Sequence, residues 1–202
     1  GVARLARVAA ENGITLVHVS SDYVFDGSAD SYDEEAPLAP VGVYGQSKAA
    51  GDVAASTAPR HYIVRTSWVI GEGNNFVKTM ASLAERGIDP KVVDDQIGRL
   101  TFTDDIARGI RHLLEGTASY GTYNLSSTGP ATSWFGVAQD VFTQTGHDAG
   151  RVDGVSTEDY FSEAGNPVSP RPRNSELDLS ALEEIGFSPT AGADALREYL
   201  GS

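Results

Sequence analysis

ITLVHVSS, from Ile14 to Ser21, is the stretch that decides the fold of this sequence. It is short, rich in β-branched residues and ends in two serines, a pattern typical of a buried parallel strand. A helical pattern, Val2 to Asn12, comes before it and ends at Gly13. After a long polar loop, Ser47 to Thr57 continues a helix that already carries Tyr44. Helix, strand and helix in this order predict a parallel sheet covered by helices.

The same alternation continues along the chain. HYIVRTSWVIG, His61 to Gly71, is predicted to be a second buried strand, and GTYNLSS, Gly121 to Ser127, a later one. Further elements are expected at Phe76–Arg86, Lys91–Gln96, Thr103–Leu114, Ser133–Thr145, Leu179–Ile185 and Ala193–Leu200. We therefore predict an α/β fold with a doubly wound parallel sheet. Residues 1–128 are expected to form this domain, and residues 129–202 a smaller lobe.

Composition excludes several classes of protein. The 202 residues carry a net charge of −13, which argues against nonspecific nucleic-acid binding. They contain no cysteine, which excludes disulfides and thiolate metal sites and fits a cytoplasmic protein. No apolar run approaches the roughly 18 residues of a membrane span. The four histidines have no metal-ligand spacing, so we predict no catalytic metal.

Candidate chemistry gathers at the ends of the two predicted strands, where ligands bind in open α/β sheets. The first strand ends at Ser20 and Ser21, and the second passes through Thr66. Between them, Tyr44 and Lys48 lie four residues apart and share one face of a helix. A nearby ammonium stabilises a phenolate, which favours proton transfer by the tyrosine. Y-x-x-x-K alone is common on exposed helices, but the strand ends beside it favour a carbonyl-reduction site.

Several motifs carry a resemblance to a known family. VSSDYVFDG, PVGVYGQSKAAGD, VRTSWVIG and SPRPRNSELD resemble the extended short-chain dehydrogenase/reductases, and within them the dTDP-4-dehydrorhamnose reductases. The resemblance covers nearly the whole chain in order. It implies that the sheet is the C-terminal part of a Rossmann-type sheet, joined to a small mixed α/β substrate lobe.

The resemblance also implies an activity, the reduction of the 4-keto group of dTDP-4-dehydro-L-rhamnose by NADPH or NADH. Tyr44 then protonates the keto oxygen, Lys48 holds the nicotinamide ribose, and Ser21 orients the carbonyl. Cofactor contacts are expected at Ser20, Tyr44, Lys48 and Thr66. Contacts with the dTDP-sugar are expected at Ser21, Asp22, Tyr23, Trp68, Asn75, Arg171, Arg173 and Asn174.

Some of these residues have an alternative interpretation that is purely structural. A tryptophan that follows a buried strand, such as Trp68, usually belongs to the core. Arg171 and Arg173 would then be two solvated arginines of a Pro-rich linker, although guanidinium groups suit a diphosphate. The acidic run DSYDEEA, residues 30–36, is expected to be a solvated loop.

A glycine-rich turn after a strand, which receives the cofactor pyrophosphate, is not found in the sequence. A fragment that has lost its first βαβαβ portion, or a short protein that no longer binds cofactor, would explain this. We favour the fragment. The 202 residues alone are then expected to bind nicotinamide cofactor poorly, to be inactive and to expose an apolar strand edge.

Two other functions stay open. One is a non-catalytic regulatory or binding subunit, which would have no need to keep Ser21, Tyr44 and Lys48 together. The other is a nucleotide-sugar epimerase or dehydratase, for which Asp22 could serve, but Tyr23 follows where a glutamate is wanted. A homodimer and a fusion to another rhamnose-pathway enzyme also stay open.

Overall fold

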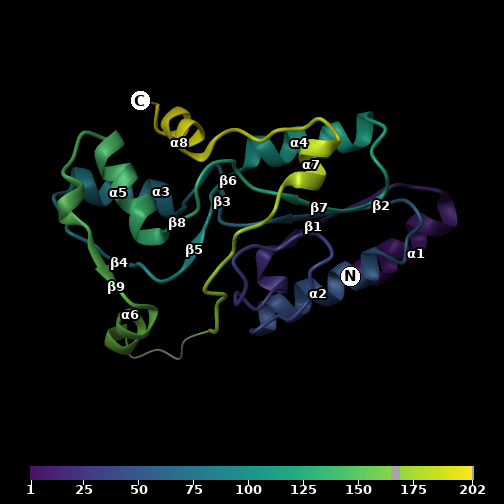
Figure 1. The fold of residues 1–202 in the computed structure, drawn as a ribbon, viewed down its shortest axis with the longest axis horizontal. Coiled ribbons are helices and arrows are strands. Elements are labelled where there is room, and N and C mark those ends of the chain that lie inside the picture. The colour runs from purple at the N-terminus through teal and green to yellow at the C-terminus, as the bar shows by residue number, and fades with distance from the viewer. Residues whose placement is uncertain (165–168, 202) are drawn as a thin grey trace.

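A parallel sheet of three strands forms the centre of the protein (Figure 1). The computed structural model describes residues 1–164 and 169–201. The strand order is β1 (Leu16–Ser21), β2 (His61–Thr66) and β7 (Gly121–Leu125). The register pairs Ser21 with Thr66 and Thr66 with Leu125, so the three carboxyl ends meet at one edge. The predicted α/β fold is confirmed.

Helices cover both faces of this sheet, as the strand–helix alternation predicts. On one face lie α1 (Val2–Asn12) and α2 (Val43–Ala55), and on the other α4 (Thr103–Glu115) and α7 (Ser180–Glu184) (Figure 1). The helix α1 has the predicted bounds and ends at Gly13. The helix α2 begins just before Tyr44, so both Tyr44 and Lys48 are in its first half.

The remaining elements lie beyond the carboxyl ends of the central strands (Figure 1). Helices there are α3 (Phe76–Glu85), α5 (Trp134–Gln144), α6 (Thr157–Ala164) and α8 (Gly192–Leu200). Short strands pair as β3 (Val69–Ile70) with β6 (Thr101–Phe102), β4 (Lys91–Val93) with β9 (Asp153–Val155), and β5 (Ile97–Gly98) with β8 (Thr132–Ser133). Two short 3₁₀ helices are η1 (Asp22–Val24) and η2 (Ala149–Arg151).

The second predicted strand is shorter than expected. It ends at Thr66, and the chain turns at Trp68, whose φ of 44° lies in the left-handed region. This turn sends β3 to a separate pairing with β6. The helix α6 was not predicted, because its sequence TEDYFSEA is acidic and lacks a clear apolar stripe.

Among the described residues three hydrophobic clusters hold the molecule together, and the smallest packs Phe25 and Tyr32 against Leu177. The sheet core packs Val64 and Leu125 against Leu113 and Leu182 from α4 and α7. The second core takes residues from before and after position 128, among them Val77 of α3 and Phe142 of α5. The division at residues 128 and 129 therefore stays a prediction.

Within the described residues, no helix is long and apolar enough to cross a membrane.

The strand β1 forms one edge of the sheet among the described residues. Apolar side chains of this strand and of the residues just before it lie open, with Val19 exposed by 41% and Ile14 by 54%. The sequence predicted such an apolar edge, and the structure contains it. An unpaired edge of this kind favours pairing with another strand.

Candidate active site

The helix α2 packs directly against the 3₁₀ turn η1 that follows β1. Gly45, buried on the helix face, makes this close packing feasible. A Cβ atom at position 45 would lie 2.1 Å from the backbone oxygen of Tyr23, closer than non-bonded atoms can approach. The glycine after Tyr44 therefore sets how near the helix comes to the end of β1.

Gly45→Ala tests this close approach. Alanine normally stabilises a helix interior by about 1 kcal/mol relative to glycine. Here we expect the opposite sign, a loss of about 1–3 kcal/mol in the free energy of unfolding, because overpacking must push α2 away from η1. Urea unfolding measures this change. Gly150→Ala, in the exposed 3₁₀ helix η2, is the control, and a stabilised Gly45→Ala protein would contradict the close packing.

Tyr44 and Lys48 lie at the carboxyl edge of the sheet, as predicted. The Tyr44 side chain is 57% exposed, and its ring meets Tyr23 edge to face, with ring centroids 5.5 Å apart. The Lys48 Nζ donates a hydrogen bond of 2.6 Å to the carbonyl oxygen of Val19 in β1. The ammonium has three N–H donors, so this bond fixes its position and leaves it able to bind more.

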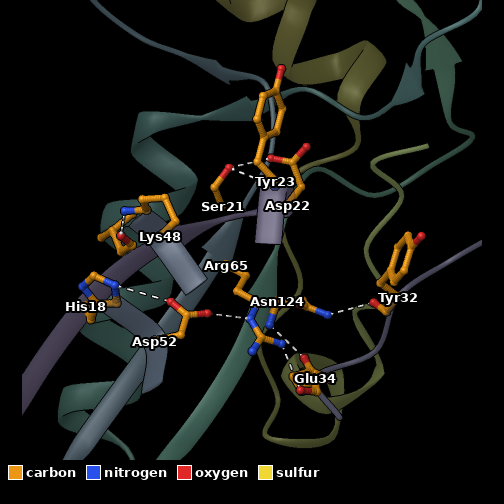
Figure 2. A network of polar contacts seen from close by, with 11 residues as sticks. His18, Ser21, Asp22, Tyr23, Tyr32, Glu34, Lys48, Asp52, Arg65 and Asn124 are labelled. Atoms are coloured by element: carbon orange, nitrogen blue, oxygen red, sulfur yellow. Dashed lines mark hydrogen bonds and ion pairs between the residues drawn. The ribbon is translucent and has the colours of Figure 1, made fainter. Parts of the chain in front are cut away.

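Ser21 and Asp22 form a buried pair at the end of β1 (Figure 2). The Ser21 hydroxyl donates to Asp22 Oδ1 at 2.9 Å and accepts from the backbone N–H of Tyr23 at 3.2 Å. Burial raises the pKa of Asp22 to about 6, against the opposing effect of hydrogen bonds from Ser175 and Ser21. Asp22 is only 3% exposed, and its contact with a sugar nucleotide stays a prediction.

The two predicted cofactor contacts beside this pair lie on opposite faces of the sheet. Thr66 pairs with Ser21 in the register and so points to the same face. Thr66 Oγ1 is buried and has no hydrogen-bond partner among the described residues. Ser20 points to the α2 face, is 3% exposed and lies beside Asp52. Ser20 Oγ likewise has no hydrogen-bond partner among the described residues, and both assignments stay predictions.

Tyr23 and Arg171 connect the strand ends to a cavity. Burial raises the pKa of Tyr23, and the nearby Arg171 guanidinium opposes that rise. Arg171 also lies over the ring of Phe161, 5.9 Å from its centroid. The cavity measures about 550 Å³. Its aromatic and basic lining consists of Phe76, Lys91, Trp134, Tyr160, Phe161 and Arg171.

Three other predicted contact residues have structural partners. Trp68 is half-buried and stacks on Trp134, with ring centroids 3.9 Å apart. Asn75 caps α3 by accepting from the Lys78 N–H, and it donates to the Tyr199 hydroxyl. Asn174 donates to the carbonyl oxygens of residues 29 and 30 and so fastens the 169–179 segment to the acidic loop. Their contacts with a sugar nucleotide stay predictions.

Arg173 lies in the same segment and has an exposed side chain. Its carbonyl oxygen accepts a hydrogen bond of 2.8 Å from the Ile97 N–H. The backbone of Arg173 is therefore fixed while its guanidinium faces solvent. Its contact with a diphosphate also stays a prediction.

The acidic run 30–36 was predicted to be a solvated loop; it is a loop in which Asp30, Ser31, Asp33 and Glu35 are exposed, but Tyr32 and Glu34 turn inward. The Tyr32 ring is 6% exposed and stacks on Phe25, with centroids 4.4 Å apart. Glu34 Oε1 accepts from the backbone N–H of Asn124 in β7 at 2.8 Å. Burial of the carboxylate raises the pKa of Glu34, and the hydrogen bond from Asn124 opposes that rise. The loop docks on the sheet because its polar groups find partners on β7.

Sequence reasoning missed two features of this region. One is the aromatic wall of the cavity, whose members are far apart in the chain. The other is a buried ion pair between Asp52 of α2 and Arg65 of β2. The signal for it was present, since Arg65 is a lone charge in an apolar strand. Among the described residues no cluster of three or more His, Asp or Glu side chains could hold a metal ion.

A comparison with protein families places the chain. The model of the family described as RmlD substrate binding domain matches residues 1–202, the full length of the chain. The chain belongs to this family.

Individual proteins similar to this RmlD-family chain are also found. It is 40% identical to the spore coat polysaccharide biosynthesis protein SpsK of Bacillus subtilis, over 93% of the chain and 64% of that protein. It is 36% identical to the dTDP-4-dehydrorhamnose reductase of Aggregatibacter actinomycetemcomitans, over 98% of the chain and 70% of that protein. The chain thus spans about two thirds of the length of these relatives.

A solved structure matches the fold closely. The crystal structure of dTDP-4-dehydrorhamnose reductase from Bacillus anthracis in complex with NADP superposes with a TM-score of 0.87. It is 35% identical in sequence, and the match covers all of the RmlD-family chain and 70% of the reductase. The Rossmann-type character of the sheet is thereby confirmed.

Proposed function

We propose that this RmlD-family chain carries the catalytic residues of an NADPH- or NADH-dependent reductase that converts dTDP-4-dehydro-L-rhamnose to dTDP-L-rhamnose. The observation that carries the proposal is the Tyr44–Lys48 pair at the edge where Ser21 and Thr66 end their strands. The names of the Aggregatibacter and Bacillus anthracis relatives, and the NADP in the latter structure, support it.

The exposed side of this site fits the nicotinamide end of a dinucleotide. Lys48 would hold the ribose hydroxyls, and the unpaired buried hydroxyl of Thr66 offers a further contact. The reduced nicotinamide, when bound, supplies the hydride for the keto carbon. Tyr44 gives its phenolic proton to the keto oxygen, and the neighbouring ammonium of Lys48 stabilises the phenolate that remains. Ser21 positions the same oxygen.

The cavity beyond Tyr23 suits the nucleotide of the substrate. In a chain with a net charge of −13, the cavity nevertheless contains Lys91 and Arg171. Guanidinium and ammonium groups match a diphosphate, and aromatic walls such as Phe161 and Trp134 can stack on a base. Arg171 contacts both the cavity and Tyr23, so a sugar nucleotide bound here would extend toward Ser21.

Turnover tests the proposal. The protein in its natural length, mixed with the 4-keto sugar nucleotide and NADPH or NADH, should consume the reduced cofactor, seen as falling absorbance of the nicotinamide. Binding of the sugar nucleotide without cofactor consumption would favour a binding subunit. Release of a dehydrated or epimerised sugar, seen by mass spectrometry and NMR, would favour the other enzyme classes.

The cellular setting is proposed with the function. A cytoplasmic location fits an enzyme that uses a nucleotide sugar and a nicotinamide cofactor. A homodimer, or a fusion to another enzyme of the rhamnose pathway, is the assembly we propose to look for. Light scattering of the natural protein measures its mass, and a monomer of unfused length would contradict both.

A further inference from the structure

Asp52 shares its face of α2 with the two proposed catalytic residues. Tyr44, Lys48 and Asp52 are spaced by four residues each, which places them in one row along the helix. The row runs from the exposed Tyr44 through the half-buried Lys48 to Asp52, which is only 2% exposed. A buried carboxylate at the end of this row needs partners on the sheet below.

The Asp52 carboxylate spans the two strands beneath the helix (Figure 2). Oδ2 accepts from Arg65 Nε of β2 at 3.0 Å, and Oδ1 lies 3.4 Å from His18 Nε2 of β1. Burial by itself raises the pKa of Asp52, but contacts with His18, Ser20 and Arg65 outweigh it and hold that pKa below its usual value. The helix is therefore joined to β2 by an ion pair, and it approaches β1 through the contact with His18.

The attachment is tight and reaches the loop as well. A Cβ atom at Gly51 would lie 2.9 Å from His18 Nε2, so the helix backbone packs closely on the His18 imidazole of β1. Arg65 also donates to the carbonyl oxygen of Glu34 at 2.9 Å and lies over the Phe25 ring. One guanidinium thus joins β2, α2 and the loop that follows Ser21.

We propose that Asp52 is a positioning residue of the active site: bound to Arg65 and in contact with His18, it fixes the rotation and height of α2 so that Tyr44 and Lys48 face the end of β1. The proposal rests on the proposed reductase function for its kinetic consequence. A displacement of about 1 Å in a reacting group can cost about 100-fold in rate.

Stability alone does not explain this arrangement. An apolar pair of similar volume often replaces a buried ion pair without loss of stability, whereas removing one partner leaves a buried charge and is strongly destabilising. An apolar pair, however, packs without the directional contacts that fix the rotation of a helix. The double variant Asp52→Leu/Arg65→Met removes both charges together. It therefore separates a role of the ion pair in stability from a role in fixing the rotation of α2.

A matched control comes from the opposite face of the sheet. Asp105 of α4 is also 2% exposed and pairs with Arg108, which lies on the same helix. The double variant Asp105→Leu/Arg108→Met removes an ion pair with an equally buried carboxylate, but with a half-exposed arginine, on the opposite face of the sheet from α2. Urea unfolding first shows that both variants are folded. We then measure kcat and KM for each variant, and the NMR cross-peaks between the rings of Tyr23 and Tyr44.

The expected result is specific to the Asp52 variant. Its kcat should fall about 10- to 100-fold with KM for the sugar nucleotide within about threefold of wild type. Its Tyr23–Tyr44 cross-peaks should weaken, while the control keeps both. Wild-type kcat and intact cross-peaks in the folded Asp52 variant would overturn the proposal. If the wild type shows no turnover but the cross-peaks weaken as expected, positioning stands and the reductase function fails.

Discussion

Replacing Tyr44 by phenylalanine is expected to lower kcat by about 100- to 10,000-fold, the usual contribution of a positioned general acid. The change removes one oxygen atom from a side chain that is 57% exposed. The edge-to-face contact of the ring with Tyr23 does not use that oxygen. Folding and cofactor affinity should therefore stay close to wild type, and the loss should be confined to the chemical step.

The measurement is the rate of NADPH oxidation with the 4-keto sugar nucleotide, together with calorimetry of cofactor binding. Tyr120→Phe is a matched control, since Tyr120 is also exposed, by 43%, and bonds to Arg60 at the amino ends of the strands, opposite the edge where Tyr44 lies. The control should keep the wild-type rate. A Tyr44→Phe enzyme at full rate would remove Tyr44 as the proton donor.

Replacing Asp22 by asparagine is expected to stabilise the protein by about 3 kcal/mol at pH 8. Burial raises the pKa of Asp22 in the folded protein from 3.8 to about 6. The unfolded chain therefore loses this proton at lower pH than the folded protein, and the folded state becomes less stable as pH rises from about 4 to 6. A shift of about two pKa units corresponds to about 3 kcal/mol. Asparagine carries no such cost.

Urea unfolding at pH 5 and pH 8 checks this prediction. The gain for Asp22→Asn at pH 5 should be about half of the gain at pH 8, because ionisation of Asp22 in the folded state is then still incomplete. Asp26→Asn provides a control of opposite sign, since a hydrogen bond from Tyr32 lowers the pKa of Asp26. That variant should lose stability at pH 8. An equal gain for Asp22→Asn at both pH values would contradict the burial effect.

Local patterns were enough to predict the sheet and its helices. The α1 bounds follow from an apolar stripe and a terminal glycine, which depend on neighbours in the sequence. The pairing of Tyr44 with Lys48 on one helix face could also be predicted, because i and i+4 spacing is a property of a single helix. These features need no knowledge of distant residues.

Features made by distant residues could not be read in this way. The turn at Trp68 depends on stacking against Trp134, 66 residues further along the chain. The docking of Glu34 depends on a backbone N–H of β7, whose position the loop composition does not show. The ion pair of Asp52 depends on Arg65, which lies on another element, so the sequence of the helix alone does not predict it.

The attachment of the acidic loop to the 169–179 segment has a consequence for the order of folding. Tyr32 pairs with Leu177, and Asn174 holds the carbonyl oxygen of a residue 145 positions earlier. During synthesis, α1, β1, α2 and β2 leave the ribosome long before these partners exist. The loop behind Ser21 can therefore reach its final conformation only when nearly the whole chain is available, whereas the neighbouring helices can form from local contacts. The part of the site that contains Ser21 is therefore completed late in folding, although Ser21 lies near the start of the sequence.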